Sequence, residues 1–297
     1  MREQDDLLFL AKQLHLDYQA EFHFTTWRDL GHRATYSLSR LSQFSSRSFN
    51  QVTYEPQRDL ISKCSTDPIR LQNEYNYLNA LPQRVRRYFP ALASTKLQQT
   101  TNQQMKLELE YIPFPNLAEL FLHWHIGSNS WIQIARRLNL IRSALQQPEE
   151  GRTKSPVTDL QWLYSRKLEL RLSQLSSSPP ATHESSGISW SQFWNEPIKL
   201  SLNGSTRSHD FLLPSPHNSS QELLKDLAPH EKAKPLQRIH GDLCFNNILA
   251  EPLSGSIRLI DPRGERPTGA HWPIGFGDNR YDLIKILHSS RYLYDVV

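Results

Sequence analysis

The segment Ile239–Gly264 constrains the fold and the chemistry of this chain more than any other stretch. It reads IHGDLCFNNILAEPLSGSIRLIDPRG and contains two short apolar runs separated by a turn with Pro and Gly. This pattern predicts two antiparallel strands joined by a hairpin loop. Antiparallel pairing would bring the start of the first strand close to the end of the second. We therefore expect Asn247 and Asp261 to be neighbours, with Asp242 on the loop before them.

These three polar side chains are suited to a divalent cation and to phosphate chemistry. Mg²⁺ prefers hard oxygen ligands, and it keeps substrate phosphate oxygens in its remaining coordination positions. An amide oxygen and a carboxylate at the open end of a hairpin, beside a third oxygen donor, match that preference. The hairpin therefore predicts a magnesium site formed by Asn247 and Asp261, with Asp242 next to it.

The run HGDLCFNN resembles the pattern His-x-Asp-x-x-x-x-Asn of the aminoglycoside phosphotransferase and choline kinase superfamily, which shares the protein kinase fold. LIDPRG resembles the segment that carries the second metal-binding Asp. The two runs together are most similar in sequence to a bacterial branch found with capsule and surface-polysaccharide genes. The resemblance implies that Asp242 is the catalytic base and that Asn247 and Asp261 bind the metal. It also implies that His240 belongs to the catalytic loop, which it would brace without taking part in the chemistry.

Two strand-like runs and a helix precede this segment. Residues 48–55 and 59–65 are expected strands, and Asp67-Pro68 is expected to start a helix as N-cap and N1. Glu74 would lean toward the apolar face of that helix, where an unpaired carboxylate is costly, so Lys63 is its expected partner. The resemblance implies that this pair binds the α- and β-phosphates of the nucleotide. From the residues alone, a solvated lysine and a glutamate at the rim remain an alternative.

A strand, a Pro-rich break and a capped helix follow, as in a hinge between two lobes. LELEY alternates like a half-buried strand, and Asn116 with Glu119 has the spacing of a capping box. The resemblance implies that adenine contacts backbone groups near Glu110 to Ile112. We expect an α+β, two-lobed protein-kinase-like fold. Residues 1–112 would form an antiparallel-sheet N-lobe, and residues 113–297 a mainly helical C-lobe with the catalytic loop and metal site.

The remaining C-lobe residues give less specific signals. Two apolar stripes predict helices over 131–147 and 160–175, and the Ser/Pro-rich stretches 176–181 and 212–220 are expected loops. Between those stretches lie the aromatic residues Trp190, Phe193 and Trp194. They suit either an acceptor pocket that stacks on a sugar or a surface insertion that packs its own aromatics.

Charged residues near the C-terminus are expected to support the site. Asp278 has the position of an N-cap for the last helix, and Asp282 is interpreted as scaffold. Arg263 would either contact a phosphate or an acidic acceptor, or pair with one of these two carboxylates.

Two features depart from protein kinases. The stretch Tyr36–Asn50 contains no Gly, although it is rich in Ser and carries Arg, so it would be either an unusual phosphate-binding turn or a polar surface loop. Asp261 is followed by Pro-Arg-Gly, and the short remaining sequence leaves no room for an activation segment with the helices that bind protein substrates. We therefore expect a small-molecule acceptor.

Composition excludes several other classes of protein. The chain has 38% hydrophobic residues, a formal net charge of +4, and two cysteines far apart in sequence. There is no disulfide framework, no zinc pattern, no spanning apolar run and no long basic block. We expect a cytoplasmic protein with no nucleic-acid partner and no membrane span; its oligomeric state is not predicted.

The sequence thus predicts an ATP-dependent phosphotransferase that uses Mg²⁺ and acts on a hydroxyl of a small molecule, with a sugar or polysaccharide precursor as the expected acceptor. Asp242 would accept the proton of that hydroxyl or orient it. The alternative is a nucleotide-binding pseudokinase or interaction module without turnover.

Overall fold

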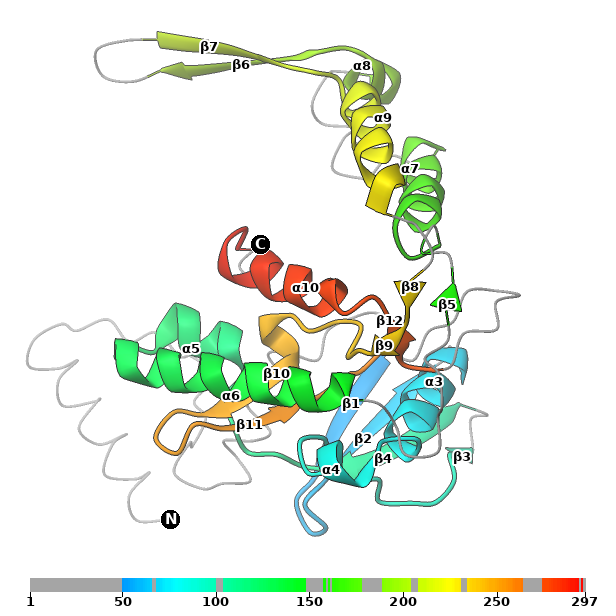
Figure 1. Ribbon diagram of the computed structural model, residues 1–297, viewed down its shortest axis with the longest axis vertical. Helices are drawn as coiled ribbons and strands as arrows, with labels where there is room; N and C mark the ends of the chain where they lie inside the picture. The colour runs from blue at the N-terminus through cyan, green and yellow to red at the C-terminus, as the bar shows by residue number, and fades with distance from the viewer. Residues whose placement is uncertain are drawn as a thin grey trace, which may run out of the picture.

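The computed structural model describes residues 50–65, 68–99, 104–147, 157–158, 160, 162–177, 189–203, 208–230, 234–263, 274–293 and 295 of the 297-residue chain. Helices and small antiparallel sheets are combined in this part of the chain (Figure 1), so the expected α+β class is confirmed. The Ser-rich stretch expected to contact phosphate lies outside the described residues, apart from its last residue.

A four-stranded antiparallel sheet lies near the start of the described chain. Its strands are β1 (Asn50–Glu55), β2 (Leu60–Ser65), β4 (Met105–Glu110) and β3 (Gln98–Gln99), in the order β1-β2-β4-β3. Lys63 on β2 pairs in register with Val52 on one side and Leu107 on the other. Because directly opposite residues of an antiparallel pair share a face, Lys63 points to the same side of the sheet as the buried Leu107.

Helix α3 (Pro68–Asn79) follows β2 and contacts both β2 and β4. Its buried residues include Leu71, Glu74 and Leu78, which recur at helical spacing as the sequence predicts. Glu74 is therefore on the face that packs toward the sheet. The helix begins at Pro68, the residue expected at N1.

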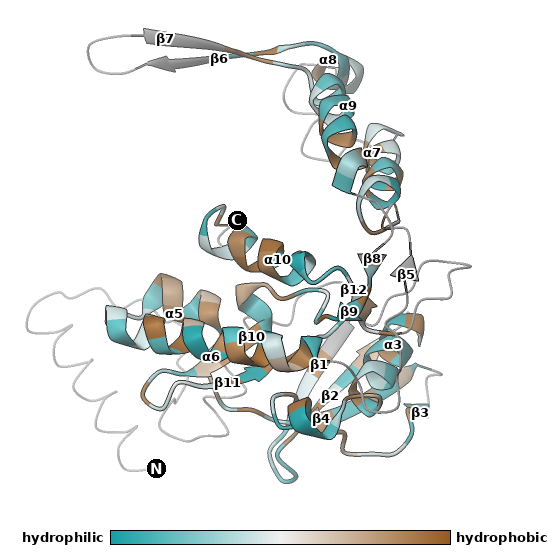
Figure 2. Cartoon of the chain, viewed as in Figure 1, coloured by the Kyte–Doolittle hydropathy of each residue, from teal (hydrophilic) through white to brown (hydrophobic). Residues whose placement is uncertain are grey.

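The second half of the body consists of helices around a β-hairpin. Its elements are α4 (Gln83–Arg86), α5 (Leu117–His123), α6 (Ser128–Gln146), β10 (Ile248–Glu251) and β11 (Ser256–Leu259). The Asn116 side chain accepts the Glu119 backbone N–H at 2.7 Å, which caps α5 as expected. The apolar stripe of α6 buries Ile134, Leu138, Ile141 and Leu145, and Figure 2 shows hydrophobic residues along this helix.

One hydrophobic core connects the sheet with the hairpin. It contains Leu107 and Leu109 from β4, Tyr77 from α3, and Ile248 and Leu259 from the hairpin, all less than a tenth exposed. Full burial of such a side chain stabilises the fold by about 1.5–3 kcal/mol relative to exposure. The sheet and the hairpin are therefore held together by packing, which fixes the position of Lys63 relative to the hairpin end.

The middle of the chain forms an arm that projects from this body (Figure 1). It contains a π-helical turn (Trp162–Arg166), α7 (Lys167–Ser177), α8 (Trp190–Asn195), β6 (Ile198–Asn203), β7 (Ser208–Leu213), α9 (Pro216–Leu227) and a 3₁₀ turn (Ala228–His230). The loop expected over 212–220 is wrong, because α9 begins at Pro216. Ser215 caps it by accepting the Asn218 N–H, so the Ser-Pro pair marks a helix start and not a loop.

The aromatic residues of α8 pack on one another within the arm. The rings of Trp190 and Phe193 stack with centroids 5.2 Å apart, and those of Trp190 and Trp194 lie 6.1 Å apart. The Trp190 indole N–H donates to backbone carbonyls at the end of α7. These contacts favour the surface insertion over the sugar-stacking pocket among the two sequence interpretations.

The chain returns to the body through short strands and ends in a helix. β5 (Val157–Thr158) pairs with β8 (Lys234–Pro235), β9 (Gln237–Arg238) pairs with β12 (Phe276–Gly277), and α10 (Arg280–Ser290) follows. No helix in the described ranges is long and apolar enough to span a bilayer.

The N-cap expected at Asp278 is displaced by one residue. The structure places Asn279 at the N-cap of α10, without a side-chain cap hydrogen bond. The Asp278 carboxylate still accepts the Arg280 backbone N–H at 3.0 Å, and it also pairs with the Arg280 guanidinium. Asp278 therefore ties down the first turn of α10 from outside the helix, which agrees with its expected scaffold role.

Candidate functional site

The hairpin β10–β11 places the predicted metal ligands side by side. Ile248 pairs with Leu259, and the Ile260 backbone N–H donates to the Asn247 carbonyl at 3.0 Å. Asn247 and Asp261 therefore stand at the open end of the hairpin, which confirms the neighbourhood expected from the sequence. Asp261 has a left-handed backbone with φ of 54°, an uncommon conformation for a residue other than Gly. This backbone turn directs the chain after β11 back toward His240.

Lys63 connects the sheet, α3 and the hairpin. Its ammonium donates to Glu74 Oε1 at 2.7 Å, which is the predicted ion pair, and it also makes a close contact with Asp261 Oδ1. Its side chain is 14% exposed and that of Glu74 is 11% exposed, whereas Asp261 is about half exposed at 48%. One cation is thus shared by two carboxylates that are distant in sequence, and one of those carboxylates still faces solvent.

Burial and charge attraction have opposite effects on the pKa values in this cluster. Burial opposes the charged form of Lys63, but attraction by Asp261 and Glu74 outweighs it and raises the lysine pKa. Partial burial also opposes ionisation of Asp261, yet the Lys63 ammonium holds the Asp261 pKa below its usual value. Burial raises the pKa of Glu74, against the attraction of Lys63. Lys63 is therefore fully charged at neutral pH.

Replacing Lys63 with Met is expected to lower the free energy of unfolding by about 3–5 kcal/mol, because it leaves Glu74 buried without its cation. Urea unfolding checks this value. The double variant Lys63→Met/Glu74→Gln is expected to recover part of the loss, because the unpaired charge is then absent. Strictly additive losses in the two single variants would contradict the coupling.

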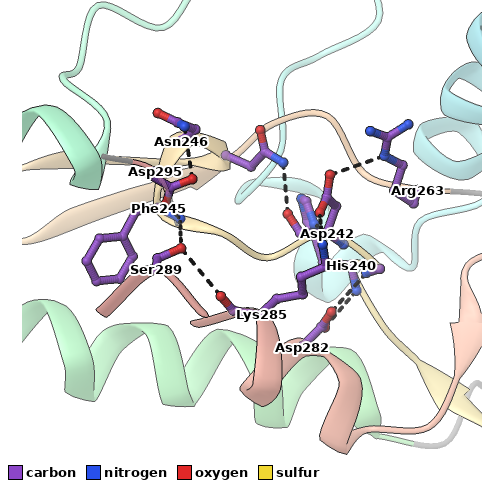
Figure 3. A network of polar contacts seen from close by, with 11 residues as sticks. His240, Asp242, Phe245, Asn246, Arg263, Asp282, Lys285, Ser289 and Asp295 are labelled. Carbon is purple, nitrogen blue, oxygen red and sulfur yellow. Dashed lines mark hydrogen bonds and ion pairs between the residues drawn. The ribbon is translucent and has the colours of Figure 1, made fainter. Parts of the chain in front are cut away.

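Asp242 lies between two cations from different elements (Figure 3). Arg263 Nε donates to Asp242 Oδ2 at 3.2 Å, and Lys285 Nζ of α10 lies 2.9 Å from Asp242 Oδ1. Burial opposes ionisation of Asp242, but the attraction of Lys285 and Arg263 prevails and lowers its pKa. Asp242 is therefore a carboxylate at neutral pH.

These contacts correct one expectation and add one residue. Arg263 pairs with Asp242, and not with Asp278 or Asp282 as one interpretation of the sequence proposed. Lys285 was missed. It lies three residues after Asp282 on α10 and so shares a helix face with it, which is the signal that could have placed it at the site.

The loop residues around Asp242 are held by buried polar groups. His240 is fully buried, its Nε2 donates to the Ile260 carbonyl at 2.9 Å, and its Nδ1 accepts the Asp242 backbone N–H at 3.3 Å. Burial lowers the pKa of His240, so the ring is neutral in this arrangement. Asp282, 1% exposed, accepts the backbone N–H groups of His240 and Gly241 at 2.8 and 2.9 Å. Both residues act as braces, as expected.

The turn after Asp242 is fixed by further contacts. The side-chain amide of Asn247 donates to the Asp242 carbonyl at 2.8 Å, which leaves its amide oxygen as the atom that could bind a cation. The Phe245 backbone N–H donates to Ser289 Oγ at 2.9 Å and to Asp295 at 3.1 Å. The loop is therefore held by α10 and by Asp295, which lies beyond the C-terminal end of that helix (Figure 3).

The predicted adenine-binding residues lie at the end of β4. The Glu110 backbone N–H donates to the Ala91 carbonyl at 2.9 Å, and its carboxylate accepts hydrogen bonds from the Ala91 N–H and from Arg258 on β11. Ile112 is 7% exposed. The Glu110 side chain thus contacts the hairpin and does not contact Lys63. At Ile112 the structure shows no side-chain feature that identifies an adenine-binding residue.

A magnesium ion would have two protein ligands here. The described residues contain no group of three or more His, Cys, Asp or Glu side chains that could form a metal site alone. Asn247 and Asp261 supply two hard oxygens at adjacent strand ends, and Asp261 is partly open to solvent. Mg²⁺ typically uses one or two carboxylates together with waters and phosphates. The residues therefore fit a magnesium ion shared with a phosphate ligand.

Comparison of the chain with protein-family models and with curated protein sequences finds no match. The arrangement of Lys63, Glu74, Asp242, Asn247 and Asp261 is consequently the basis for the function proposed below.

Proposed function

We propose that this chain is an ATP-dependent phosphotransferase that acts on a hydroxyl group of a small molecule and uses Mg²⁺. The observation that carries the proposal is the Lys63 ammonium, which bridges Glu74 of α3 and Asp261 of the hairpin. A lysine held by a helix glutamate, opposite a metal-binding aspartate, is the phosphate grip of kinases. The proposed fold is two-lobed and kinase-like, with residues 1–112 as the N-lobe and 113–297 as the C-lobe.

Each residue of the cluster has a role in the proposed transfer. Lys63, held by Glu74, neutralises the α- and β-phosphates of ATP. The acceptor oxygen forms a bond to the γ-phosphorus while the bond from that phosphorus to the bridging oxygen breaks, and ADP leaves with the electron pair. Asp242 orients the hydroxyl and receives its proton. A carboxylate with a lowered pKa is sufficient for this role, because the transition state of such transfers is loose.

Asn247 and Asp261 would hold the magnesium ion, which supplies charge neutralisation between the β- and γ-phosphates when bound. The amide of Asn247 is already oriented by its hydrogen bond to the Asp242 carbonyl. Asp242 and Asn247 are therefore positioned by the same loop, and Asp261 lies beside them after β11, which supports one site for nucleotide and acceptor.

The proposal extends to the acceptor and the compartment. An acceptor of low molecular weight, such as a sugar or polysaccharide precursor, is proposed from the resemblance of HGDLCFNN and LIDPRG to the motifs of small-molecule phosphotransferases. Cys64 and Cys244 are both free thiols, which agrees with a cytoplasmic location where ATP is present.

Thermal unfolding with nucleotide tests the proposal. ATP and Mg²⁺ together, at about 100 times the dissociation constant, are expected to add about 2.7 kcal/mol of stability and to raise the midpoint by a few degrees. Asp261→Asn is expected to lose most of the Mg²⁺-dependent part of this shift. The matched control is Asp226→Asn, on the exposed side of α9. A wild-type midpoint that does not move with any nucleotide would overturn the proposal.

A further inference from the structure

We infer that the acceptor is anionic, and that Lys285 and Arg263 bind its phosphate or carboxylate group beside the hydroxyl that is phosphorylated. This inference rests on the proposed function, because it concerns the acceptor side of the same site. Neither the sequence motif nor the metal ligands specify the charge of the acceptor.

The two cations contact Asp242 from different parts of the fold. Lys285 comes from α10 and Arg263 from the chain after β11, and they reach the two different carboxylate oxygens of Asp242 (Figure 3). A hydroxyl that is oriented by Asp242 must approach within contact distance of these side chains. Its neighbouring substituents therefore meet a lysine ammonium and an arginine guanidinium.

The charges in contact with Asp242 favour an anionic ligand. Asp242 carries one negative charge, and the two cations in contact with it carry two positive charges, so the three groups together are positive. Each cation has a side chain that is 25% exposed, so both can be reached from solvent. A positive amine on the acceptor would be repelled here, whereas a phosphate or carboxylate would form charge-assisted hydrogen bonds.

The Lys285 ammonium is separate from the cluster around Lys63. Lys63 is held by Glu74 and Asp261, whereas Lys285 and Arg263 are held by Asp242. Arg263 also attracts the Asp261 carboxylate, whereas the Lys285 ammonium of α10 pairs with Asp242 and lies outside the Lys63 cluster. This ammonium is available to a second anionic ligand when Lys63 binds the phosphates of ATP.

Inorganic phosphate is the probe, with calorimetric binding to the full chain measured in the presence and absence of Mg²⁺ and a non-hydrolysable ATP analogue. Lys285→Gln keeps a hydrogen-bond donor of similar length but removes the charge. It is expected to weaken phosphate binding about ten-fold, as for loss of a hydrogen bond to a charged group. The matched control Lys225→Gln, at an exposed position of α9, is expected to bind phosphate as the wild type does.

A second measurement compares three probes of one sugar: glucose, glucose 6-phosphate and glucosamine. We expect the phosphorylated sugar to bind best and the amino sugar worst. Equal phosphate binding by wild type and Lys285→Gln, or preference for the amino sugar, would overturn the inference. Failure of nucleotide binding with a retained, Lys285-dependent phosphate site would instead overturn the proposed function and keep the anion site.

Discussion

Replacing Asp242 with Ala is expected to lower the rate of ATP-dependent phosphorylation of the acceptor by about 10²–10⁴-fold, as for loss of a positioned general base. The carboxylate that orients the hydroxyl is removed, while Lys63, Glu74 and Asp261 are left in place. We therefore expect nucleotide affinity to change little. The measurement is consumption of ATP with a panel of sugars and sugar phosphates, together with the nucleotide affinity of each variant.

The Asp242 variants also distinguish an enzyme from a pseudokinase or interaction module that has no turnover. Asp242→Asn keeps the side-chain size but presents an amide to Arg263 and Lys285, so it is expected to be as inactive as Asp242→Ala. Asp226→Ala, at an exposed position of α9, is expected to retain full activity. If nucleotide and Mg²⁺ bind and neither acceptors nor water are phosphorylated by the wild type, the enzyme proposal fails.

Replacing Asp282 with Ala is expected to reduce the free energy of unfolding by about 2–4 kcal/mol, because two buried backbone N–H groups lose their acceptor. Asp282 is 1% exposed and accepts from His240 at 2.8 Å and from Gly241 at 2.9 Å. Gly241 has a φ of 82°, a conformation that residues with a Cβ rarely adopt, so glycine suits the turn that presents its amide to Asp282. Urea unfolding followed by tryptophan fluorescence gives the value.

Asp282→Asn offers a graded comparison for this loss. Its amide group has one acceptor oxygen, and its NH₂ would face the second backbone N–H, so about half of the effect is expected. Asp226→Ala on α9 serves as the surface control and is expected to stay within about 0.5 kcal/mol of the wild type. An Asp282→Ala protein that unfolds at the wild-type urea concentration would show that the two amides find other acceptors.

Local patterns in the sequence were enough to predict the elements that position the site. The apolar runs around the Pro- and Gly-containing turn predicted β10 and β11, and the hairpin register then placed Asn247 beside Asp261. The Lys63–Glu74 pair could be predicted because Glu74 falls on the buried face of a clearly periodic helix. In each case the spacing along one or two adjacent elements determines which side chains meet.

Contacts between distant elements could not be predicted in this way. The partner of Arg263 depends on how the chain after β11 returns to the loop before β10, and the Lys285 contact depends on how α10 packs across that loop. The arm was also misjudged, since Ser and Pro between residues 212 and 220 favour a loop by composition, yet Ser215 and Pro216 start a helix. Tertiary packing decides these cases, and a single sequence carries little of that information.

The contacts of α10 join the last helix to the loop before β10. Asp282 and Ser289 of this helix accept the backbone amides of His240, Gly241 and Phe245. The amides of His240 and Gly241 are bound to this helix, so we expect them to exchange hydrogen with solvent when α10 moves away. The loop that carries Asp242 is therefore expected to open together with α10 as one unit of local unfolding.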